Sequence, residues 1–572
     1  MVPASGGQCL GALFCDGSTR AAGFDNFNRQ IWAVDERGVA VTNAYDQIDR
    51  VVASAYLPFT SENNMPTDTT SVPSNLTPST CNWASIYGGF SNQIIRYAYD
   101  KIGNVTNLTD WAGTITNAYD ALNRNVCSFT TFSSAPSLFY SLLNGFDLAD
   151  NRTAMTLNAP NETWQTEYSY DSLNRLSTLN NMEAQLDVEY SYNPNGKLAS
   201  RTGHSEVVNC AYAYDSEQRL QSITVNNSKT LTYAYNNAQQ ISTIDDRLGT
   251  AYDYIYTYDN RDQLTSEETD GPSWYNRGYS YDHARNRINA TFNNGSASSF
   301  SYTLANKLTN ITYGSATANH RYAYDCAGNL TNLISTSATN RFYYNAQNKL
   351  GRIEGRGFTN EFRYDSQNRR IGLNHAGIWR YDLHDGMICI GSVTNGTIER
   401  FFVRGVGIAD GTGDIIAELR REQYGYWSQH YYVANHRGDT VLVYDINQLE
   451  EHYARYDAFG NVVEKTGSFT PRYTFSTKEY LSDAKLYLYA YRVYDPIAGR
   501  WTQRDPIDYQ DSINLYCYCR NNPLNKTDID GREPITLTTL AIIAVVSVAG
   551  GALVGGGVSK ACGGSFKQGV TV

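Results

Sequence analysis

The chain has few of the residue patterns that mark the common classes of metalloenzyme and cofactor-dependent enzyme. Its ten cysteines include no CxxC pair, so neither a zinc site nor a disulfide framework is predicted. Its eight histidines include no HExxH motif, and no glycine-rich phosphate loop precedes a helical pattern. We therefore predict no metal and no cofactor.

Clusters of positive charge and helix-forming runs are also scarce. The 46 basic residues form no dense cluster and are outnumbered by 57 acidic residues, which gives a formal charge of −11. A net acidic chain is poorly suited to a phosphate backbone, so nucleic acid is not predicted as a partner. Long helices built from Ala, Leu, Glu and Lys are not expected.

The N-terminus lacks the features of a secretory signal peptide. Its first 20 residues contain no basic segment followed by an apolar one. Repeat-like sequence begins almost at once, at Phe24. We therefore expect residues 1–23 to be an incomplete lead-in and the chain to be a fragment of a longer protein.

Tyrosine, by contrast, is abundant, with 46 residues. Aromatic and β-branched side chains favour pleated, half-buried surfaces, whereas Asn, Asp and Gly favour the turns between strands. The composition therefore predicts many short strands joined by tight turns.

A tyrosine-centred unit recurs along the chain at intervals of 20 to 23 residues. A Tyr-x-Tyr alternation, such as Tyr212-Ala213-Tyr214, places aromatic rings on one face of a strand. Asp or Asn then opens a polar turn, and a second alternating run begins at Leu or Ile, as at Leu220. Each unit is therefore predicted to be a β-hairpin. The regularly spaced units start at Tyr170, Tyr192, Tyr214, Tyr235, Tyr258, Tyr281, Tyr302, Tyr324, Tyr344 and Tyr364. Another unit starts at Tyr119, and weaker copies start at Tyr45 and Tyr99.

One hairpin buries too little surface to be stable by itself. Hairpins stacked side by side pair their edges and give a continuous sheet, which its own twist makes curl. The predicted fold class is all-β, with stacked hairpins forming one long curled sheet.

These units resemble the YD repeat of Rhs proteins, of the C components of insecticidal toxin complexes and of the teneurin extracellular shells. The resemblance covers residues 24–532. It implies that residues 24–400 form a hollow, spirally wound β-sheet shell, which in the bacterial members holds a C-terminal polypeptide, usually a toxin. In this interpretation the Tyr-Asp pairs pack the sheet and cap turns, and no repeat tyrosine is a catalyst.

Residues 401–532 resemble the Rhs repeat-associated core domain. The matching motifs are LYLYAYRVYDPIAGRW from Leu486, RDPI from Arg504 and DIDGR from Asp528. In the family this module plugs one end of the shell and acts as an aspartyl autoprotease. The resemblance therefore implies at most a single-turnover cut that releases the segment after the module.

By the same resemblance, the two catalytic acids fall on Asp505 and Asp528, and the supporting arginine on Arg492. The cut is expected between Arg532 and Glu533. Two carboxyls held close together cannot both ionise easily, so one keeps a proton while the other acts as a base toward water. A nearby guanidinium can stabilise the charge that develops on the scissile carbonyl.

Two positions depart from the usual family ending, Asp-Pro-x-Gly-Leu. Ile529 replaces the proline, which leaves the approach of the chain less fixed, and Arg532 replaces the leucine before the cut. A second interpretation is that the two acids only cap turns. Asp495 and Asp530 are the closest alternative candidates for the two acids.

Residues 533–572 form a Gly-rich tail whose stretch 535–558 carries no charge. As a helix, this stretch would be long enough to span a bilayer, and its glycines would allow close helix packing there. Three interpretations remain open: a membrane-active effector, a membrane anchor, or the beginning of a longer variable toxin region.

The resemblance as a whole implies a polymorphic-toxin container of the kind used in competition between bacteria. Its predicted partners are its own C-terminal segment as cargo, an upstream shell or delivery-apparatus protein, and a membrane through the tail. It would be found at the cell surface or be secreted through a specialised apparatus. The alternative is a catalytically silent surface protein whose YD repeats bind carbohydrate or another cell.

Overall fold

A computed structural model describes most of the chain between Cys9 and Thr536. The described residues are 9–13, 19–58, 88, 93–203, 207–249, 251–270, 275–292, 295–314, 319–406, 414–510 and 512–536. Within these ranges, 39 strands form one sheet, and the remaining strands form a sheet of four and a pair. The predicted all-β fold class is confirmed.

The first half of the long sheet comprises β1 (Cys9–Leu13), β2 (Thr19–Phe24), β3 (Gln30–Val34), β4 (Val39–Tyr45), β5 (Val51–Pro58), β6 (Ile94–Tyr99), β7 (Val105–Thr109), β8 (Gly113–Tyr119), β9 (Asn125–Phe132), β10 (Ala135–Phe146), β11 (Arg152–Ala159), β12 (Glu162–Tyr170), β13 (Leu176–Asn181), β14 (Leu186–Tyr192), β15 (Leu198–Thr202), β16 (Asn209–Tyr214), β17 (Leu220–Val225), β18 (Lys229–Tyr235), β19 (Ile241–Asp246) and β20 (Tyr252–Tyr258).

The second half comprises β21 (Leu264–Thr269), β22 (Tyr275–Tyr281), β23 (Arg287–Phe292), β24 (Ala297–Tyr302), β25 (Leu308–Tyr313), β26 (His320–Tyr324), β27 (Leu330–Ile334), β28 (Thr339–Tyr344), β29 (Leu350–Gly355), β30 (Phe358–Tyr364), β31 (Arg370–His375), β32 (Ile378–Asp385), β33 (Ile388–Thr394), β34 (Thr397–Gly405), β35 (Asp414–Arg421), β36 (Trp427–Ala434), β37 (Thr440–Asp445), β38 (Glu450–Tyr456) and β39 (Val462–Thr466).

Each strand of the long sheet pairs antiparallel with the next strand in the chain. The hairpins coincide with the tyrosine units, and a register shift falls at the repeat tyrosine, as between Ser169 and Tyr170. The sheet is therefore a continuous meander, as the stacked-hairpin prediction requires.

The Asp of each unit organises its turn, as the turn at Asp171 illustrates. One carboxylate oxygen of Asp171 accepts the backbone N–H groups of Leu173 and Arg175 at 2.9 and 3.0 Å, and the other accepts Arg175 Nε at 2.7 Å. Asn174 lies in the left-handed region with φ of 58°. Asn tolerates this conformation better than most residues, which explains its frequency at this position.

The Tyr of each unit ties one hairpin to the preceding one. The Tyr192 hydroxyl donates to the Leu176 carbonyl at 2.8 Å, and the Arg175 guanidinium lies 4.5 Å from the Tyr192 ring centroid. The same hydroxyl contact recurs from Tyr214 to Leu198. The motif is therefore explained by turn capping and hairpin stacking, as predicted.

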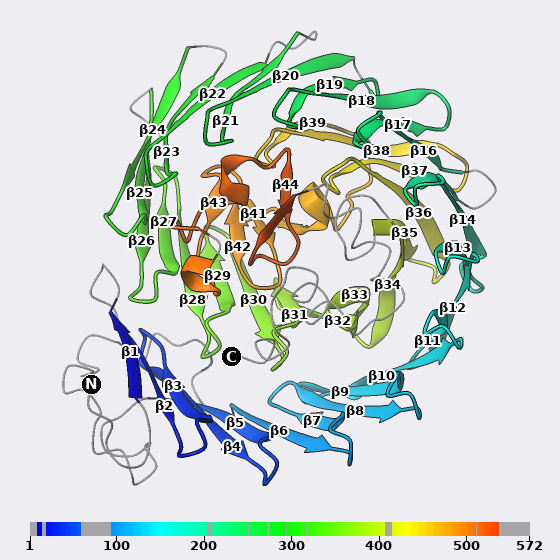
Figure 1. Cartoon of the computed structure of the whole chain (residues 1–572), viewed down its shortest axis with the longest axis vertical. Helices are drawn as coiled ribbons and strands as arrows, with labels where there is room; N and C mark the ends of the chain where they lie inside the picture. Colours follow the sequence, from blue (N-terminus) through cyan, green and yellow to red (C-terminus); the bar gives the residue numbers. More distant parts are fainter. Residues whose placement is uncertain are drawn as a thin grey trace.

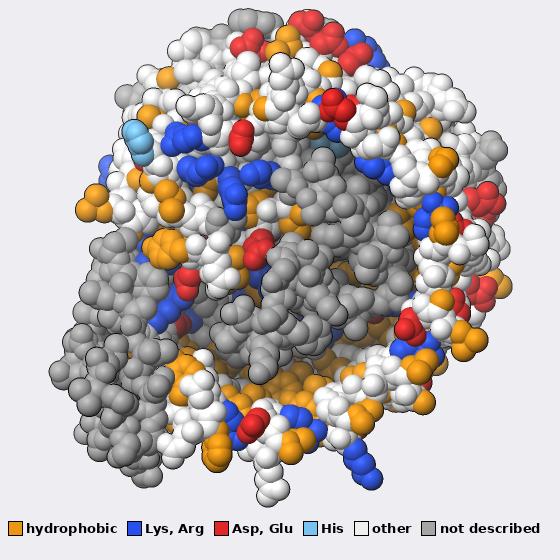
Figure 2. Space-filling view, viewed as in Figure 1, with side chains coloured by type: hydrophobic (Ala, Val, Ile, Leu, Met, Phe, Trp, Pro, Cys, Tyr) orange, Lys and Arg blue, Asp and Glu red, His pale blue; other side chains and the backbone are white. Residues whose placement is uncertain are grey.

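The sheet winds on itself, so that its later strands lie inside its earlier ones (Figure 1). Trp164 on β12 stacks on Phe401 of β34 at 4.9 Å and meets Trp427 of β36 edge-on at 4.9 Å. The Tyr140 hydroxyl on β10 donates to the His384 carbonyl on β32 at 3.1 Å. The largest apolar core therefore lies between two layers of one sheet. In the space-filling view, hydrophobic side chains line a recess inside the lower rim (Figure 2).

The C-terminal module lies inside the ring of strands (Figure 1). Its short elements are η3 (Phe475–Thr477), β40 (Glu479–Leu481), β41 (Leu486–Leu488), β42 (Val493–Asp495), β43 (Arg500–Trp501), η4 (Asp508–Gln510), η5 (Cys519–Asn521), β44 (Lys526–Asp528) and β45 (Pro534–Thr536). The long sheet itself continues to the end of β39, past residue 401, where the core-domain resemblance begins.

Hydrogen bonds fix this module to the long sheet around it, β1–β39, which we call the wall. The Tyr516 hydroxyl donates to the Gly328 carbonyl at 2.8 Å, and Asn521 Nδ2 donates to the Arg285 carbonyl at 2.9 Å. The module's own core is an aromatic cluster that includes Tyr494 and Trp501. The wall and the module are therefore packed together as one structure.

The apolar stretch 535–558 lies almost entirely outside the described residues, since only Ile535 and Thr536 are described, in β45. Within the described part of the chain, no helix is long and apolar enough to cross a membrane.

Candidate active site

Arg492 brings the two predicted acids together. Its guanidinium lies 2.8 Å from a carboxylate oxygen of Asp505 and 3.3 Å from one of Asp528. The Trp501 ring centroid lies 4.2 Å from the guanidinium carbon, and Arg492 is 2 % exposed. The three residues that the resemblance selects thus meet at one buried point.

The predicted cut lies in the turn of the β44–β45 hairpin. Asp528 on β44 is in register with Pro534 on β45, so the Arg532–Glu533 bond belongs to the connection. One carboxylate oxygen of Asp528 accepts the N–H groups of Gly531 and Arg532 at 2.7 and 3.0 Å. Asp528 therefore both caps this turn and lies beside the predicted scissile peptide.

Gly531 is required by the geometry of this turn. Its φ of 94° is unfavourable for other residues, and an added Cβ would lie 3.2 Å from the backbone nitrogen of Arg492. The glycine thus lets the turn approach the arginine closely.

The carbonyl of the predicted scissile bond faces the guanidinium. Arg492 Nη2 donates to the Arg532 carbonyl at 3.2 Å, and Nε donates to the Gly531 carbonyl. A guanidinium in this position can stabilise negative charge on the Arg532 oxygen. The arrangement has the parts of a site for peptide-bond hydrolysis.

Burial changes the acidity of Asp528. It raises the pKa of the carboxyl to about 6, while the positive charge of Arg492 opposes the rise. Asp505 is also buried, and its carboxylate accepts the Ile507 N–H at 3.1 Å. Asp528 can therefore hold a proton near neutral pH, as one member of an acid pair must.

The two other carboxylates of the motif have different surroundings. Asp495 accepts the N–H groups of Ile497 and Ala498 and caps its own turn. Asp530 forms an ion pair with the Arg532 side chain at 2.6 Å. Neither forms an ion pair with Arg492 in the described structure.

Lys349 is a residue of this region that sequence reasoning missed. It comes from the wall, between β28 and β29, and its ammonium donates to the Ala490 carbonyl at 3.3 Å. Lys349 and Arg532 lie 4.2 and 4.3 Å from the Tyr491 ring centroid. Burial lowers the pKa of Lys349 to about 7. No local motif identifies this lysine, because its contacts are far away in the chain.

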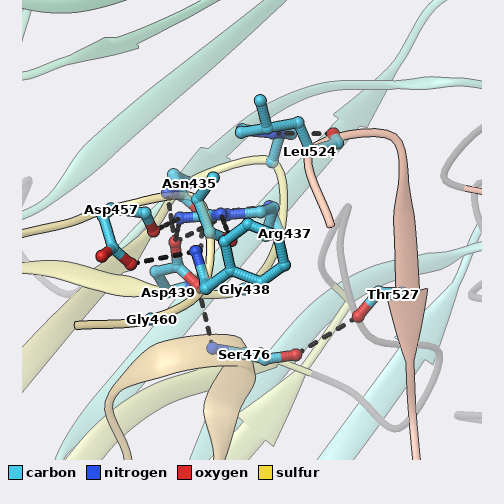
Figure 3. Close-up of polar contacts among 12 residues, drawn as sticks. Asn435, Arg437, Gly438, Asp439, Asp457, Gly460, Ser476, Leu524 and Thr527 are labelled. Carbon is cyan, nitrogen blue, oxygen red and sulfur yellow. Dashed lines mark hydrogen bonds and ion pairs between the residues drawn. The ribbon is translucent and has the colours of Figure 1, made fainter. Parts of the chain in front are cut away.

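A second polar cluster contacts the hairpin at Thr527 (Figure 3). Arg437 pairs with Asp439 at 2.6 Å, and Asp439 accepts the Ser476 N–H at 2.9 Å. The Ser476 hydroxyl lies 3.2 Å from that of Thr527, which precedes Asp528. This cluster links the last wall strands to β44 and so fixes the position of Asp528, one of the two predicted catalytic acids.

The described residues contain no group of three or more His, Cys, Asp or Glu side chains that could hold a metal ion.

Sequence comparisons find similarity to toxin-complex proteins. A family model for the teneurin YD-shell matches residues 142–266. Toxin subunit YenC2 of Yersinia entomophaga is 52 % identical over 50 residues, which are 9 % of this chain and 5 % of that protein. Toxin subunit YenC1 of the same organism is 31 % identical over 125 residues, 22 % of this chain and 10 % of that protein.

Comparison with solved structures finds the same fold. A crystal structure of TcdB2-TccC3-TEV superposes with a TM-score of 0.71 at 17 % identity, covering 91 % of this chain and 28 % of that one. The chain therefore spans less than a third of this solved relative, and the matched segments are small parts of the two YenC subunits.

Proposed function

Because this chain belongs to the YD-repeat family of Rhs proteins and toxin-complex subunits, we propose that it is a container that cuts its own chain. The cut falls between Arg532 and Glu533 and releases the segment that follows. One observation carries the proposal: a single buried guanidinium contacts both predicted acids and the carbonyl of the predicted scissile bond.

The proposed step is hydrolysis by an acid pair. Water adds to the carbonyl carbon of Arg532, and Asp505, ionised against Arg492, accepts one of its protons. Arg492 stabilises the charge on the carbonyl oxygen. Asp528, as the neutral acid, donates its proton to the nitrogen of Glu533 while the carbon–nitrogen bond breaks. The products are a carboxyl group on Arg532 and a free amine on Glu533.

Enclosure of the released segment is the second part of the proposal. It is supported by the position of β44, inside the ring of strands (Figure 1). The chain after Glu533 therefore starts within the wall, and it includes the apolar stretch 535–558. We propose this segment as the cargo and a toxin-complex subunit as the delivery partner, with the assembled protein secreted or displayed at the cell surface.

Intact-mass measurement of the purified full chain tests self-cleavage. We expect one fragment that ends at Arg532 and one that begins at Glu533. Asp505→Asn and Asp528→Asn should each leave the chain uncut, whereas the control Asp495→Asn, at the turn-capping carboxylate, should still be cut. An uncut wild-type chain, or equal cutting in all variants, would refute the proposal and favour the non-catalytic surface protein that binds carbohydrate or cells.

A further inference from the structure

One inward-facing position of the repeat carries an arginine in a few units. The residue six positions after the repeat tyrosine is apolar and buried in most units, as at Leu264 and Leu308. This position is occupied by Arg287 and Arg370 in two units, and by Arg152 in a third hairpin that has Phe146 in place of the tyrosine. A buried arginine is costly unless its charge is paired, so each of these three residues needs a partner.

Two of these arginines have carboxylate partners. Arg152 pairs with Asp385 at 2.5 Å, and Arg370 pairs with Glu479. Arg287 is 6 % exposed, and no carboxylate of the described residues lies within ion-pair distance of it. Arg287 therefore carries a buried positive charge without an ionic partner in the described structure.

Aromatic rings surround the Arg287 guanidinium. Its carbon lies 3.9 Å from the Phe459 ring centroid and 4.7 Å from that of Tyr279. Cation–π contacts of this kind stabilise the charge but do not use the N–H groups at the edge. Two of those groups, Nε and Nη2, have no hydrogen-bond partner among the described residues.

The edge of Arg287 borders a small cavity of about 40 Å³. The cavity exists because Ala290 occupies a position that holds larger apolar residues, such as Ile311, in other units. Ala290 pairs in register with Tyr279 on one side and with Ser298 on the other. The hydroxyls of Tyr279 and Ser298 also lack hydrogen-bond partners in the described structure, so several unused donors converge on one space.

The other charges around the cavity balance one another. Asp457, which lines it, pairs with Arg277, and Arg437 nearby pairs with Asp439. These pairs leave the charge of Arg287 without a counterion.

Glu267, the remaining acid of the region, does not supply that counterion. Both of its carboxylate oxygens lie 3.1 Å from the Ala458 nitrogen. Burial, followed by the charge of Asp457, raises the pKa of Glu267 to about 8. The carboxyl is therefore mainly neutral at pH 7.

We propose that Arg287, Tyr279 and Ser298 form a binding site for a small monovalent anion such as chloride. The anion would accept hydrogen bonds from the guanidinium edge and the two hydroxyls. It would neutralise the buried charge where the wall meets the core module, since Phe459 and Asp457 belong to the last wall hairpin and Gly499 of the module packs against Nη2 of Arg287. This proposal does not depend on self-cleavage.

Crystals of the full chain grown with sodium bromide test the site directly. We expect an anomalous peak for bromide within hydrogen-bonding distance of Arg287 Nε or Nη2 and of one of the two hydroxyls. A site that contains only water at high bromide concentration would overturn the proposal.

Thermal unfolding in solution gives an independent test. Gluconate is too large for the cavity and serves as the reference anion. At equal ionic strength, the wild-type melting temperature should be higher in chloride than in gluconate by on the order of 2 °C. Arg287→Leu, which restores the residue of neighbouring units, should abolish the difference, and Tyr279→Phe should reduce it. Arg152→Leu is the matched control and should keep the full difference between chloride and gluconate. A chloride effect that survives in Arg287→Leu would contradict the proposal, and the bromide experiment remains decisive if that variant does not fold.

Discussion

Single residues in the candidate active site serve structure and chemistry together. Asp528 caps the hairpin turn with one oxygen and contacts Arg492 with the other. The capping interpretation and the catalytic interpretation are therefore not exclusive, because the cap places the carboxyl beside the Arg532 peptide. The intact-mass measurement separates a turn that is merely capped from one that is also cleaved.

The raised pKa of Asp528 predicts a specific dependence of stability on pH. With a pKa of about 6, the folded chain keeps a proton that an unfolded aspartate releases near pH 4. The free energy of unfolding contributed by this group should therefore be largest below pH 4 and fall by about 3 kcal/mol as the pH rises through 6.

The uncut Asp505→Asn chain is the background in which to measure this effect. Asp528→Asn added to it imitates the neutral acid at every pH. Urea unfolding at pH 4, 5.5 and 7 should show the double variant becoming more stable relative to Asp505→Asn as the pH rises. If the difference in unfolding free energy between the two variants stayed constant from pH 4 to pH 7, the raised pKa of Asp528 would be contradicted.

At the scale of the element, the hairpin depends on its Asp-centred turn. Asp171→Ala removes the acceptor of two backbone N–H groups and the partner of Arg175. Since the turn is partly exposed to water, we expect a loss of about 1–2 kcal/mol in the free energy of unfolding, measured by urea titration. Ser172→Ala, at the exposed neighbouring position, should change it by less than about 0.5 kcal/mol. Equal effects of the two changes would show that the carboxylate does not organise the turn.

The hairpins were predictable because their determinants are local. The alternation before each tyrosine, the Asp or Asn after it and the Leu that follows are close together in the chain, and each has a direct role in the strand or turn. Arg492, Asp505 and Asp528 were selected by the family resemblance of the core motif, and the structure brings their side chains together. Lys349 and Arg287 were missed because their significance depends on residues contributed by distant strands and by the core module.

At the scale of the whole molecule, the decisive feature is that one sheet forms both layers. Pairing between neighbouring strands follows from the repeat, whereas the contact between layers joins residues more than two hundred positions apart, as with Tyr140 and His384. No local pattern specifies which strands of the second layer face which strands of the first. Large inward-facing side chains such as Trp164 supply that information through packing.

Trp164 therefore tests whether the two layers stabilise each other. Trp164→Ala removes the stacking on Phe401 and the edge contact with Trp427, at a site that is only 2 % exposed. The cavity left by the missing indole ring should lower the free energy of unfolding by about 3–5 kcal/mol and expose both layers to limited proteolysis. Leu148→Ala, at a turn residue that is 99 % exposed, is the control and should change stability by less than about 0.5 kcal/mol. If the layers were independent, Trp164→Ala would increase cleavage in the outer strands and leave β34 and β36 as protected as in the wild type. Because each layer covers the apolar face of the other, we expect protection to be lost in both at the same denaturant concentration.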